Sequence, residues 1–195
     1  MKIKILILFM LIPSLGIAQR HFKGIDAVEF KTGSRIFGST FDLSAGGAYS
    51  KYINYKSYYK IAFDVMTTDF FLYKDEIKSR SISYFLSGDY AYSFFAKERK
   101  HESFFLNAYG GLFIGVETFN LGKYRKANDF KYPYIEFDGS YKNRLVAGIE
   151  AGIEMEYFFS DRIGVIFNLK EMYSPFRKLS EWETVATAGI KYILM

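Results

Sequence analysis

The stretch GIEAGIEMEYFF, residues 148–159, alternates apolar and polar side chains with a period of two. That period is typical of a β-strand, because successive side chains of a strand point to opposite faces of the sheet. One face carries Ile149, Ala151, Ile153, Met155 and Tyr157, and the other carries Gly148, Glu150, Gly152, Glu154 and Glu156. Three carboxylates opposite five apolar side chains predict that the two faces of this strand meet different solvents.

The same period recurs along the chain and predicts seven further strands. The eight segments lie near residues 24–32, 40–52, 58–68, 79–94, 103–117, 143–158, 163–173 and 184–194. An aromatic content of 20%, with 17 Tyr and 21 Phe, agrees with this prediction, because aromatic side chains favour strands. Eight consecutive strands without an intervening helix predict an all-β, antiparallel, up-and-down barrel.

Two kinds of barrel use alternating strands, and they differ in which face is apolar. A soluble, lipocalin-like barrel keeps its apolar side chains inside, whereas an outer-membrane barrel presents them to lipid around a polar interior. Several strands of about ten residues or more suit a tilted membrane crossing. The second face is rich in Gly, Ser and isolated charges, and aromatic residues gather at strand ends. These observations favour an eight-stranded outer-membrane barrel, with Leu106, Leu112, Ile114, Ile149, Ile153, Val165 and Phe167 predicted to face lipid.

The first 18 residues predict a cleaved signal peptide. A basic start at Lys2 and Lys4 precedes an apolar run, and small residues at Gly16 and Ala18 suit cleavage before Gln19. A buried N-terminal helix is the alternative. Removing residues 1–18 from the 195 leaves 177 for a single barrel domain, residues 19–195, and lowers the net charge from +5 to +3. This modest charge gives no reason to expect direct nucleic-acid binding, and the absence of Cys excludes disulfides and a lipoprotein anchor.

The connections between the strands predict the orientation of the barrel. With both termini in the periplasm, the short turn at residues 160–162 is periplasmic and the long connection at 119–142 is extracellular. That connection and the residues beside it hold a mild excess of basic side chains, Lys123, Arg125, Lys126, Lys131, Lys142 and Arg144. They could contact lipopolysaccharide phosphates or a partner protein, and an exposed loop of mixed charge is an equally good interpretation.

The glutamates of the opening stretch predict a network of ion pairs inside the barrel. A three-residue turn at 160–162 places Glu154 opposite Asn168 and Gly152 opposite Lys170. Glu150 and Glu154 then lie diagonally on either side of Lys170, within reach of its side chain. We expect a lumenal network of Glu150, Glu154, Glu156, Lys170 and Lys191, because an unpaired buried carboxylate carries a large desolvation cost.

No pattern of residues predicts a catalytic, metal or cofactor site. The chain has two His residues, His21 and His101, and His101 lies in a charged turn beside Glu102 and Ser103. Three adjacent residues cannot aim at one reacting atom, so they do not form a triad. A G-x-S-x-G motif, a phosphate-binding loop and a His/Cys cluster for zinc are all absent from the sequence. The sequence therefore predicts a protein that is not an enzyme and carries no cofactor.

Two stretches resemble the TraO family of conjugative-transposon transfer proteins from Bacteroidota. GVETFN, residues 115–120, ends one long strand, and EMEYFFSDRI, residues 154–163, leads into the next to last strand. The run Ala18-Gln19-Arg20 also matches the way in which signals of this family end. The resemblance spans most of the C-terminal half. It implies an outer-membrane component of the conjugation apparatus, with other proteins of that apparatus as partners, and it brings no catalytic residues.

Three hypotheses for the function therefore remain open. The first is a structural or docking component of a conjugative DNA-transfer apparatus, held in the outer membrane. The second is a general outer-membrane barrel, such as a secretion accessory or an envelope-stabilising protein. The third is a lipid-modifying enzyme of the outer membrane. Phe105, Tyr109 and Phe113 are expected to point into the lumen, so one eight-stranded copy should be too narrow to conduct DNA.

Overall fold

The computed structural model describes residues 23–36, 42–72, 77–96, 103–119, 143–177 and 180–194, with the backbone only for 69–72, 77–80 and 119. The predicted cleavage site at Ala18 and Gln19 lies outside these residues, as do most of the connection at 119–142 and both His residues. In the described part of the chain, no helix is long and apolar enough to cross a membrane.

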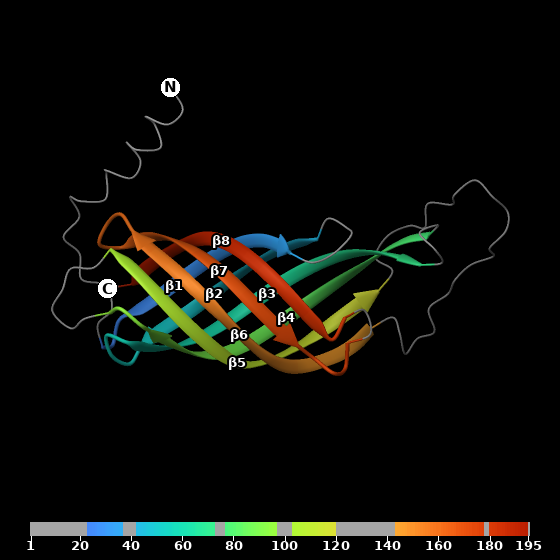
Figure 1. The fold of residues 1–195 in the computed structure, drawn as a ribbon, viewed down its shortest axis with the longest axis horizontal. Coiled ribbons are helices and arrows are strands. Elements are labelled where there is room, and N and C mark those ends of the chain that lie inside the picture. The colour runs from blue at the N-terminus through green and yellow to red at the C-terminus, as the bar shows by residue number, and fades with distance from the viewer. Residues whose placement is uncertain are drawn as a thin grey trace, which may run out of the picture.

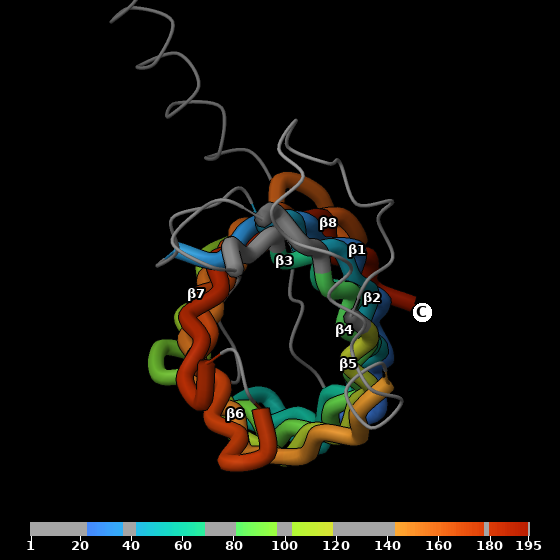
Figure 2. Tube along the Cα trace, turned by 90° about the vertical axis from the view of Figure 1, so that its right-hand side faces the viewer, coloured from blue at the N-terminus to red at the C-terminus, as the bar shows by residue number. Residues whose placement is uncertain are grey.

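Eight antiparallel strands form one closed barrel, which confirms the predicted fold (Figures 1 and 2). Each strand pairs with its neighbours in the chain, and β1 closes the sheet by pairing with β8. The strands are β1 (Asp26–Arg35), β2 (Leu43–Tyr52), β3 (Ser57–Leu72), β4 (Ile77–Ser93), β5 (Phe104–Phe119), β6 (Asn143–Phe158), β7 (Ile163–Tyr173) and β8 (Trp182–Leu194). Closure leaves no free edge along the length that all eight strands share.

The barrel wall is higher on one side than on the other. Strands β3 to β6 have 16 or 17 residues each, whereas β1, β2 and β7 have 10 or 11. Pairing between β2 and β3 stops at Leu43↔Thr67, and pairing between β6 and β7 stops at Ile149↔Tyr173. Beyond these points β3 to β6 continue as a four-stranded sheet, and the green hairpin of β3 and β4 reaches furthest right in Figure 1.

This asymmetry gives the barrel two different ends. At the short-turn end, residues 53–56 join β2 to β3 and residues 159–162 join β6 to β7. At the long-strand end, β3 to β6 extend beyond the other strands. The sequence pattern ended the third strand at residue 68 and began the fourth at residue 79, because the alternation of polar and apolar residues fades there. Pairing nevertheless continues to Leu72↔Ile77, since two antiparallel strands can extend each other without a buried face.

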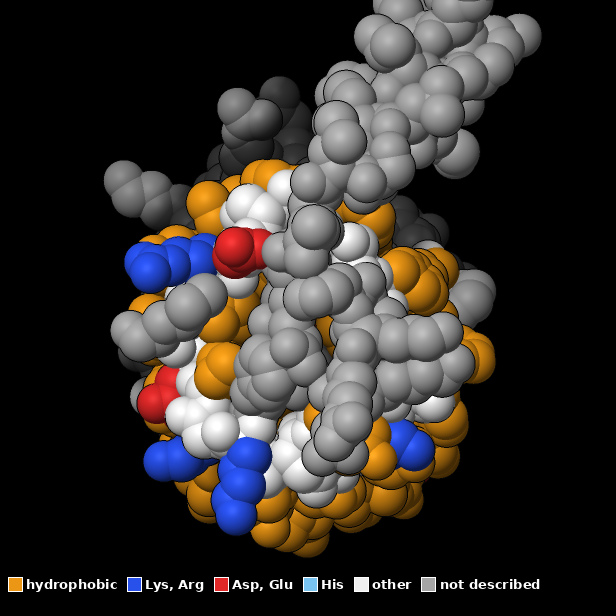
Figure 3. All heavy atoms as spheres, turned by 90° about the vertical axis from the view of Figure 1, so that its left-hand side faces the viewer, with side chains coloured by type: hydrophobic (Ala, Val, Ile, Leu, Met, Phe, Trp, Pro, Cys, Tyr) orange, Lys and Arg blue, Asp and Glu red, His pale blue; other side chains and the backbone are white. Residues whose placement is uncertain are grey.

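The outward face of the barrel is apolar over most of its surface. Five of the residues predicted to face lipid are exposed, namely Leu112, Ile114, Ile149, Ile153 and Phe167. Leu106 and Val165 are half-buried on the same face, and Leu106 pairs with the exposed Met155. Viewed from the short-turn end, apolar side chains make up most of the visible rim of the barrel (Figure 3). The large apolar side chains on the outward face therefore need an apolar environment around the barrel.

Candidate functional site

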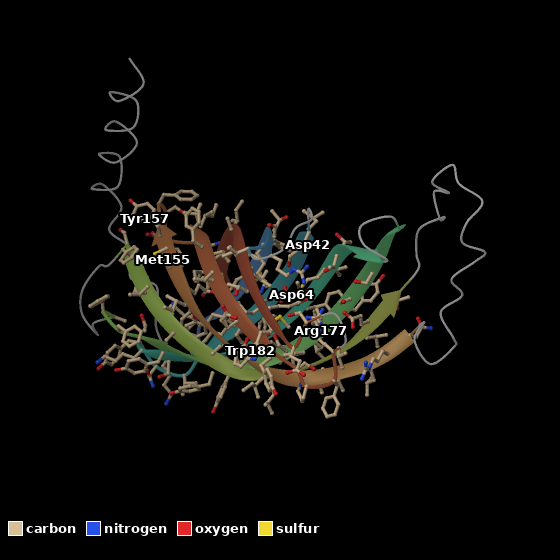
Figure 4. The ribbon with its side chains drawn as sticks, turned by 45° about the vertical axis from the view of Figure 1, so that its right-hand side comes forward. Asp42, Asp64, Met155, Tyr157, Arg177 and Trp182 are labelled. Carbon is tan, nitrogen blue, oxygen red and sulfur yellow. The ribbon has the colours of Figure 1, made fainter. Side chains whose placement is uncertain are left out.

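The lumen of the barrel is the part of this protein where charged side chains meet. The inward positions of the strands carry both apolar and charged side chains. Figure 4 shows two of the charged residues, Asp64 and Arg177, between the strands. The buried charged residues are Glu29, Lys31, Asp42, Lys60, Asp64, Asp89, Glu117, Glu150, Glu154, Glu156, Lys170, Arg177, Glu183 and Lys191. All five residues of the predicted lumenal network are among them.

Lys191 of β8 is the centre of the first group of ion pairs. Its Nζ lies 2.9 Å from Glu29 Oε1, 2.9 Å from Glu156 Oε1 and 3.5 Å from Glu154 Oε1. These carboxylates come from β1, which pairs with β8, and from β6, which lies two strands away, so the ammonium group joins three strands of the lumen wall. The Tyr58 ring lies 4.8 Å from Nζ and contributes a cation–π contact. Lys191 is completely buried, and every one of its charged contacts is a carboxylate of the lumen.

The carboxylate of Glu154 contacts donors from several strands. Lys60 Nζ lies 2.7 Å from Glu154 Oε2, Tyr58 donates a hydrogen bond of 2.9 Å to Oε1, and Asn168 Nδ2 donates one of 3.2 Å to Oε2. The Lys60 ammonium group also lies 4.2 Å from the centre of the Tyr109 ring. Lys60 belongs to β3, which lies across the lumen from β6. The pair therefore connects opposite walls of the barrel.

Lys170 of β7 forms the second group. Its Nζ lies 2.8 Å from Asp64 Oδ2 and 3.2 Å from Glu150 Oε2, and Lys31 lies 3.1 Å from Asp64 Oδ1. The register agrees with the prediction, because Gly152 pairs with Lys170 and Glu154 with Asn168.

The predicted partners of Lys170 are only half right. The sequence placed Lys170 between Glu150 and Glu154. In the structure Lys170 contacts Glu150 and Asp64, while Glu154 contacts Lys60 and Lys191. Lys60 and Asp64 come from β3. The register of the hairpin of β6 and β7 does not show which residues of β3 lie across the barrel from it. The period of two in the segment at 58–68 did place both residues on the polar face, and that signal could have found them.

A third group closes the lumen at the long-strand end. Arg177, in the connection between β7 and β8, turns inward and is buried. It contacts Glu183 and lies 3.0 Å from Glu117 Oε1, while Arg35 lies 3.1 Å from Glu183 Oε1 and 2.6 Å from Asp42 Oδ2. Burial lowers the pKa of the Arg177 guanidinium, but the charges of Glu183 and Glu117 outweigh burial and raise it above its ordinary value. The sequence analysis did not predict this group, because residue 177 lies between the predicted strands, where no periodic pattern shows the direction of a side chain.

Two apolar layers separate and flank the charged groups. The layer at the short-turn end consists of Ala27, Tyr52, Tyr58, Ala91, Ala96, Phe105, Tyr109, Phe158 and Ile193. The layer towards the long-strand end consists of Met66, Phe85, Phe113, Val146, Met172 and Val185. Phe105, Tyr109 and Phe113 point inward, as their positions in the strand pattern predict. Layers and groups of ion pairs thus follow one another along the described lumen.

The aromatic residues at strand ends divide between the two faces. The sequence analysis expected these clusters to form girdles at the two membrane interfaces. Tyr59, Phe104 and Phe159 are exposed, but their neighbours Tyr58, Phe105 and Phe158 are buried in the lumen. Since adjacent residues of a strand point to opposite faces, each of these three pairs has one outward residue and one residue of the interior layer. Phe94 and Phe95 lie just past the end of β4, and both are exposed.

Inward-facing glycines make room for the largest lumenal side chains. A Cβ atom at Gly152 would lie 2.5 Å from the Tyr109 hydroxyl, and one at Gly148 would lie 2.7 Å from the Phe113 ring. In both cases the glycine pairs directly with the aromatic residue on the neighbouring strand. Gly46 stands in the same relation to Asp64, and Gly111 to Asp89. The glycines of the polar face therefore have a steric role, because they let bulky partners lie against the wall.

The described residues include no group of three or more His, Cys, Asp or Glu side chains that could hold a metal ion. Eight of the nine buried carboxylates in the described residues lie within 4 Å of a lysine or arginine, and Asp89 is the exception. His101 and the basic residues of the connection at 119–142 lie outside the described residues, whereas Arg144 belongs to β6 and is half-buried.

Comparisons with known proteins agree on the fold. No protein-family model matches the sequence, and no curated protein does. The structure is similar to the N-terminal β-barrel domain of OprF from Pseudomonas aeruginosa, with a TM-score of 0.58 at 13% identity over 88% of this chain and 98% of that one. It is similar to the outer membrane protein OprG of the same organism, with a TM-score of 0.56 at 12% identity over 91% and 99%. It is also similar to Ail, the attachment invasion locus protein of Yersinia pestis, with a TM-score of 0.54 at 13% identity over 89% and 100%. At this identity the likeness concerns the fold, which is that of small eight-stranded outer-membrane barrels.

Proposed function

We propose that this protein is a non-enzymatic outer-membrane barrel with a closed lumen, which serves as a structural or docking component in the membrane. One observation carries the proposal. The outward face is apolar and the interior holds charged side chains in ion pairs, which is the reverse of a soluble barrel. The orientation expected from the sequence, with both termini in the periplasm, belongs to the same proposal.

The lengths of the strands support a position in a membrane. Strands β1 and β2 have 10 residues each, which matches the roughly 9–11 residues of a tilted membrane strand. Strands β3 to β6 are longer by about six residues, which at roughly 3.3 Å per residue and a tilt of about 40° adds about 15 Å. This excess projects the sheet of β3 to β6 beyond the hydrocarbon on the side of the long-strand end. A projecting sheet provides a surface on which a partner protein can dock.

The closed lumen argues for a structural role over transport. An eight-stranded barrel has an interior just wide enough for its own side chains. Here two apolar layers and three groups of ion pairs occupy that space. A catalytic carboxylate needs a free position for its substrate, and eight of the nine buried carboxylates that the structure describes already lie against a lysine or an arginine.

A more specific role in conjugative DNA transfer rests on the resemblance of residues 115–120 and 154–163 to the TraO family. These residues lie at the end of β5 and across the turn from β6 to β7, and they define strand geometry. In this role the protein would hold other components of the transfer apparatus at the outer membrane. Lipid and lipopolysaccharide would surround it, and DNA would not pass through it.

The barrel itself is tested by heat-modifiable migration. The protein extracted from membranes should migrate differently in gels before and after boiling, because a folded barrel resists the detergent. Recovery of the protein in soluble periplasm, with a single migration, would contradict the proposal. A soluble periplasmic protein of similar size, fractionated from the same cells, is the matched control for the separation.

The role in conjugation is tested by deleting the gene from a donor strain. We expect transfer of the mobile element to be lost while growth in detergent, a measure of envelope integrity, stays unchanged, and the intact gene supplied in trans should restore transfer. Normal transfer with a weakened envelope would identify a general envelope protein instead. Comparison of lipid A from the two strains tests the enzymatic alternative, since a changed profile would contradict a non-enzymatic role.

A further inference from the structure

The lumen contains more acidic than basic side chains. Among the buried residues that the structure describes, nine are acidic and five are basic, and the half-buried, inward-facing Arg35 and Arg144 add two more cations at the long-strand end. Within the described part of the chain, carboxylates therefore outnumber cations by two. An unmatched charge in a low-dielectric interior is costly, so protons or bound cations must compensate some of this excess.

One carboxylate stands apart from the other eight. Asp89 of β4 is 4% exposed, and neither of its oxygens accepts a hydrogen bond or forms an ion pair within the described part of the chain. Each of the others has at least one lysine or arginine within 4 Å. Asp89 is therefore the position at which the excess of negative charge is concentrated.

The neighbours of Asp89 explain why it has no cation. The charges that act on it are those of Glu150 from β6, Lys60 from β3 and Lys170 from β7. Lys60 is bound to Glu154 at 2.7 Å, and Lys170 is bound to Asp64 at 2.8 Å and to Glu150 at 3.2 Å. Both ammonium groups are thus committed to other carboxylates.

The backbone holds Asp89 against the wall beside Glu150. Its cross-strand partner is Gly111, where a Cβ atom would lie 2.4 Å from Asp89 Oδ1. Gly111 also pairs with Glu150 on its other side, so the two buried carboxyls face the lumen from the strands that flank this glycine. Two ionised carboxylates repel each other, and they can share a hydrogen bond only if one of them carries a proton.

We propose that Asp89 binds a proton in the folded barrel and donates it in a hydrogen bond to the Glu150 carboxylate. Lys170 holds Glu150 in its ionised form, which makes Glu150 the acceptor and Asp89 the donor. A metal ion suits this place poorly, because the ammonium groups of Lys60 and Lys170 repel it and only two carboxylates converge. The proton removes one of the two unmatched charges, and solvent supplies it.

The test compares Asp89→Asn with Asp64→Asn. An asparagine amide can donate to Glu150 as the protonated carboxyl does, so Asp89→Asn should change the unfolding equilibrium by less than about tenfold. Asp64 is ionised between Lys31 and Lys170, and its replacement removes the carboxylate that Lys31 contacts and leaves Lys170 with Glu150 alone. We expect Asp64→Asn to raise the unfolding equilibrium constant by about a hundredfold or more. Reversible urea unfolding into and out of lipid vesicles provides the measurement.

The pH dependence provides the second readout. At a pH above the ordinary titration range of a carboxyl, Asp89 keeps its proton in the native state and has lost it in the unfolded state. Native stability therefore falls as the pH rises, until Asp89 of the native state loses its proton as well. The unfolding equilibrium constant rises by at most about tenfold per pH unit in this range, and Asp89→Asn should lack this contribution to the pH dependence. Infrared difference spectra of the wild type and Asp89→Asn at neutral pH should show the carbonyl band of a protonated carboxyl in the wild type.

Three outcomes would overturn the proposal. A loss of stability in Asp89→Asn as large as that in Asp64→Asn would mean that Asp89 is ionised. A specific gain in wild-type stability with sodium, potassium or calcium at constant ionic strength would mean that a cation takes the place of the proton. Should neither variant fold, the absence of a protonated-carboxyl band from the folded wild type would contradict the proposal by itself.

Discussion

Buried lysines hold the interior of this barrel together, and Lys191 shows how. It contacts Glu29, Glu154 and Glu156, which are all fully or almost fully buried. Without the ammonium group these carboxylates would remain in the interior with less compensation. Breaking a buried pair by removing one partner is strongly destabilising, because an uncompensated charge stays behind.

We expect Lys191→Met to lower the free energy of unfolding by about 3–5 kcal/mol. Lys51→Met is the matched control, because Lys51 is exposed on the outward face of β2 and its replacement should change stability by less than about 0.5 kcal/mol. Urea unfolding in lipid vesicles measures both. Equal effects of the two substitutions would show that the lumenal network contributes nothing specific.

Gly152 has a steric role at the same scale. A Cβ atom there would lie 2.5 Å from the Tyr109 hydroxyl and 2.6 Å from the Leu169 carbonyl oxygen, so the strands must shift to accept it. We expect Gly152→Ala to destabilise the barrel by about 1–3 kcal/mol, as overpacking does.

Gly88→Ala is the control for that substitution. A Cβ atom at Gly88 meets nothing within 4 Å, so this alanine should be tolerated. The melting temperature of the two variants, read from heat-modifiable migration, compares them directly. A barrel that loses stability with Gly88→Ala but not with Gly152→Ala would contradict the steric explanation.

At the scale of elements, the connection between β7 and β8 acts as a latch: its side chains bond to the barrel wall and hold it at the long-strand end. Ser174 begins it by donating to the Ala147 carbonyl oxygen at 2.7 Å, and Arg177 then reaches Glu117 and Glu183 inside the barrel. Glu117 lies on β5 and Glu183 on β8. One side chain therefore links opposite walls of the lumen.

Arg177→Met should release this connection. Two buried carboxylates lose a partner, so we expect a loss of about 3–5 kcal/mol in stability and faster protease cleavage between β7 and β8. Arg162→Met is the matched control, because Arg162 is exposed in the turn between β6 and β7. Unchanged cleavage in Arg177→Met would show that the latch does not hold the connection.

The strands also predict how deep each outward residue lies in a membrane. Ile153 is in the middle of β6 and 51% exposed, whereas Leu145 is 67% exposed on the part of β6 that extends beyond β7. We expect Ile153→Arg to cost about 2–4 kcal/mol and Leu145→Arg about 0–1 kcal/mol, because the cost of a cation falls towards the interface. Equal costs at the two depths would contradict a membrane position for the wall.

At the scale of the whole molecule, the stacked layers of the lumen predict a barrel that does not conduct. Apolar side chains of six strands meet in the layer of Met66, Phe85, Phe113, Val146, Met172 and Val185. Two of the groups of ion pairs lie on its short-turn side, and the group of Arg177 lies on its long-strand side. We expect no steady ion conductance when the purified protein is inserted into a planar bilayer. A large porin inserted under the same conditions is the positive control, and stable open channels from this protein would contradict the closed lumen.

The sequence predicted the fold well because the evidence for it is local. Alternation along a strand assigns Ile153 and Glu154 to opposite faces without knowledge of any other strand. A turn of known length then gives the register of the adjacent strand, as the pair Glu154↔Asn168 shows. Strand ends were less accurate, because the pairing of β3 with β4 continues where the alternation fades.

The candidate site was predicted only in part. The five charged residues chosen from the sequence all lie in the lumen, but Lys60, Asp64 and Arg177 were not among them. Lys60 and Asp64 reach β6 and β7 across the interior, and Arg177 belongs to a connection without any periodic pattern. The spacing along β3 shows that Lys60 and Asp64 face the lumen, but it does not show which residues they meet there.

The sequence by itself determined the number of strands, the face on which each residue lies and the register of neighbouring strands, because each depends on contacts a few residues apart. Only the tertiary structure decided which charges meet across the lumen. Closure, tilt and stagger of the whole sheet set the height of every residue, and that height brings Lys60 to Glu154 and leaves Asp89 beside Glu150 without a cation.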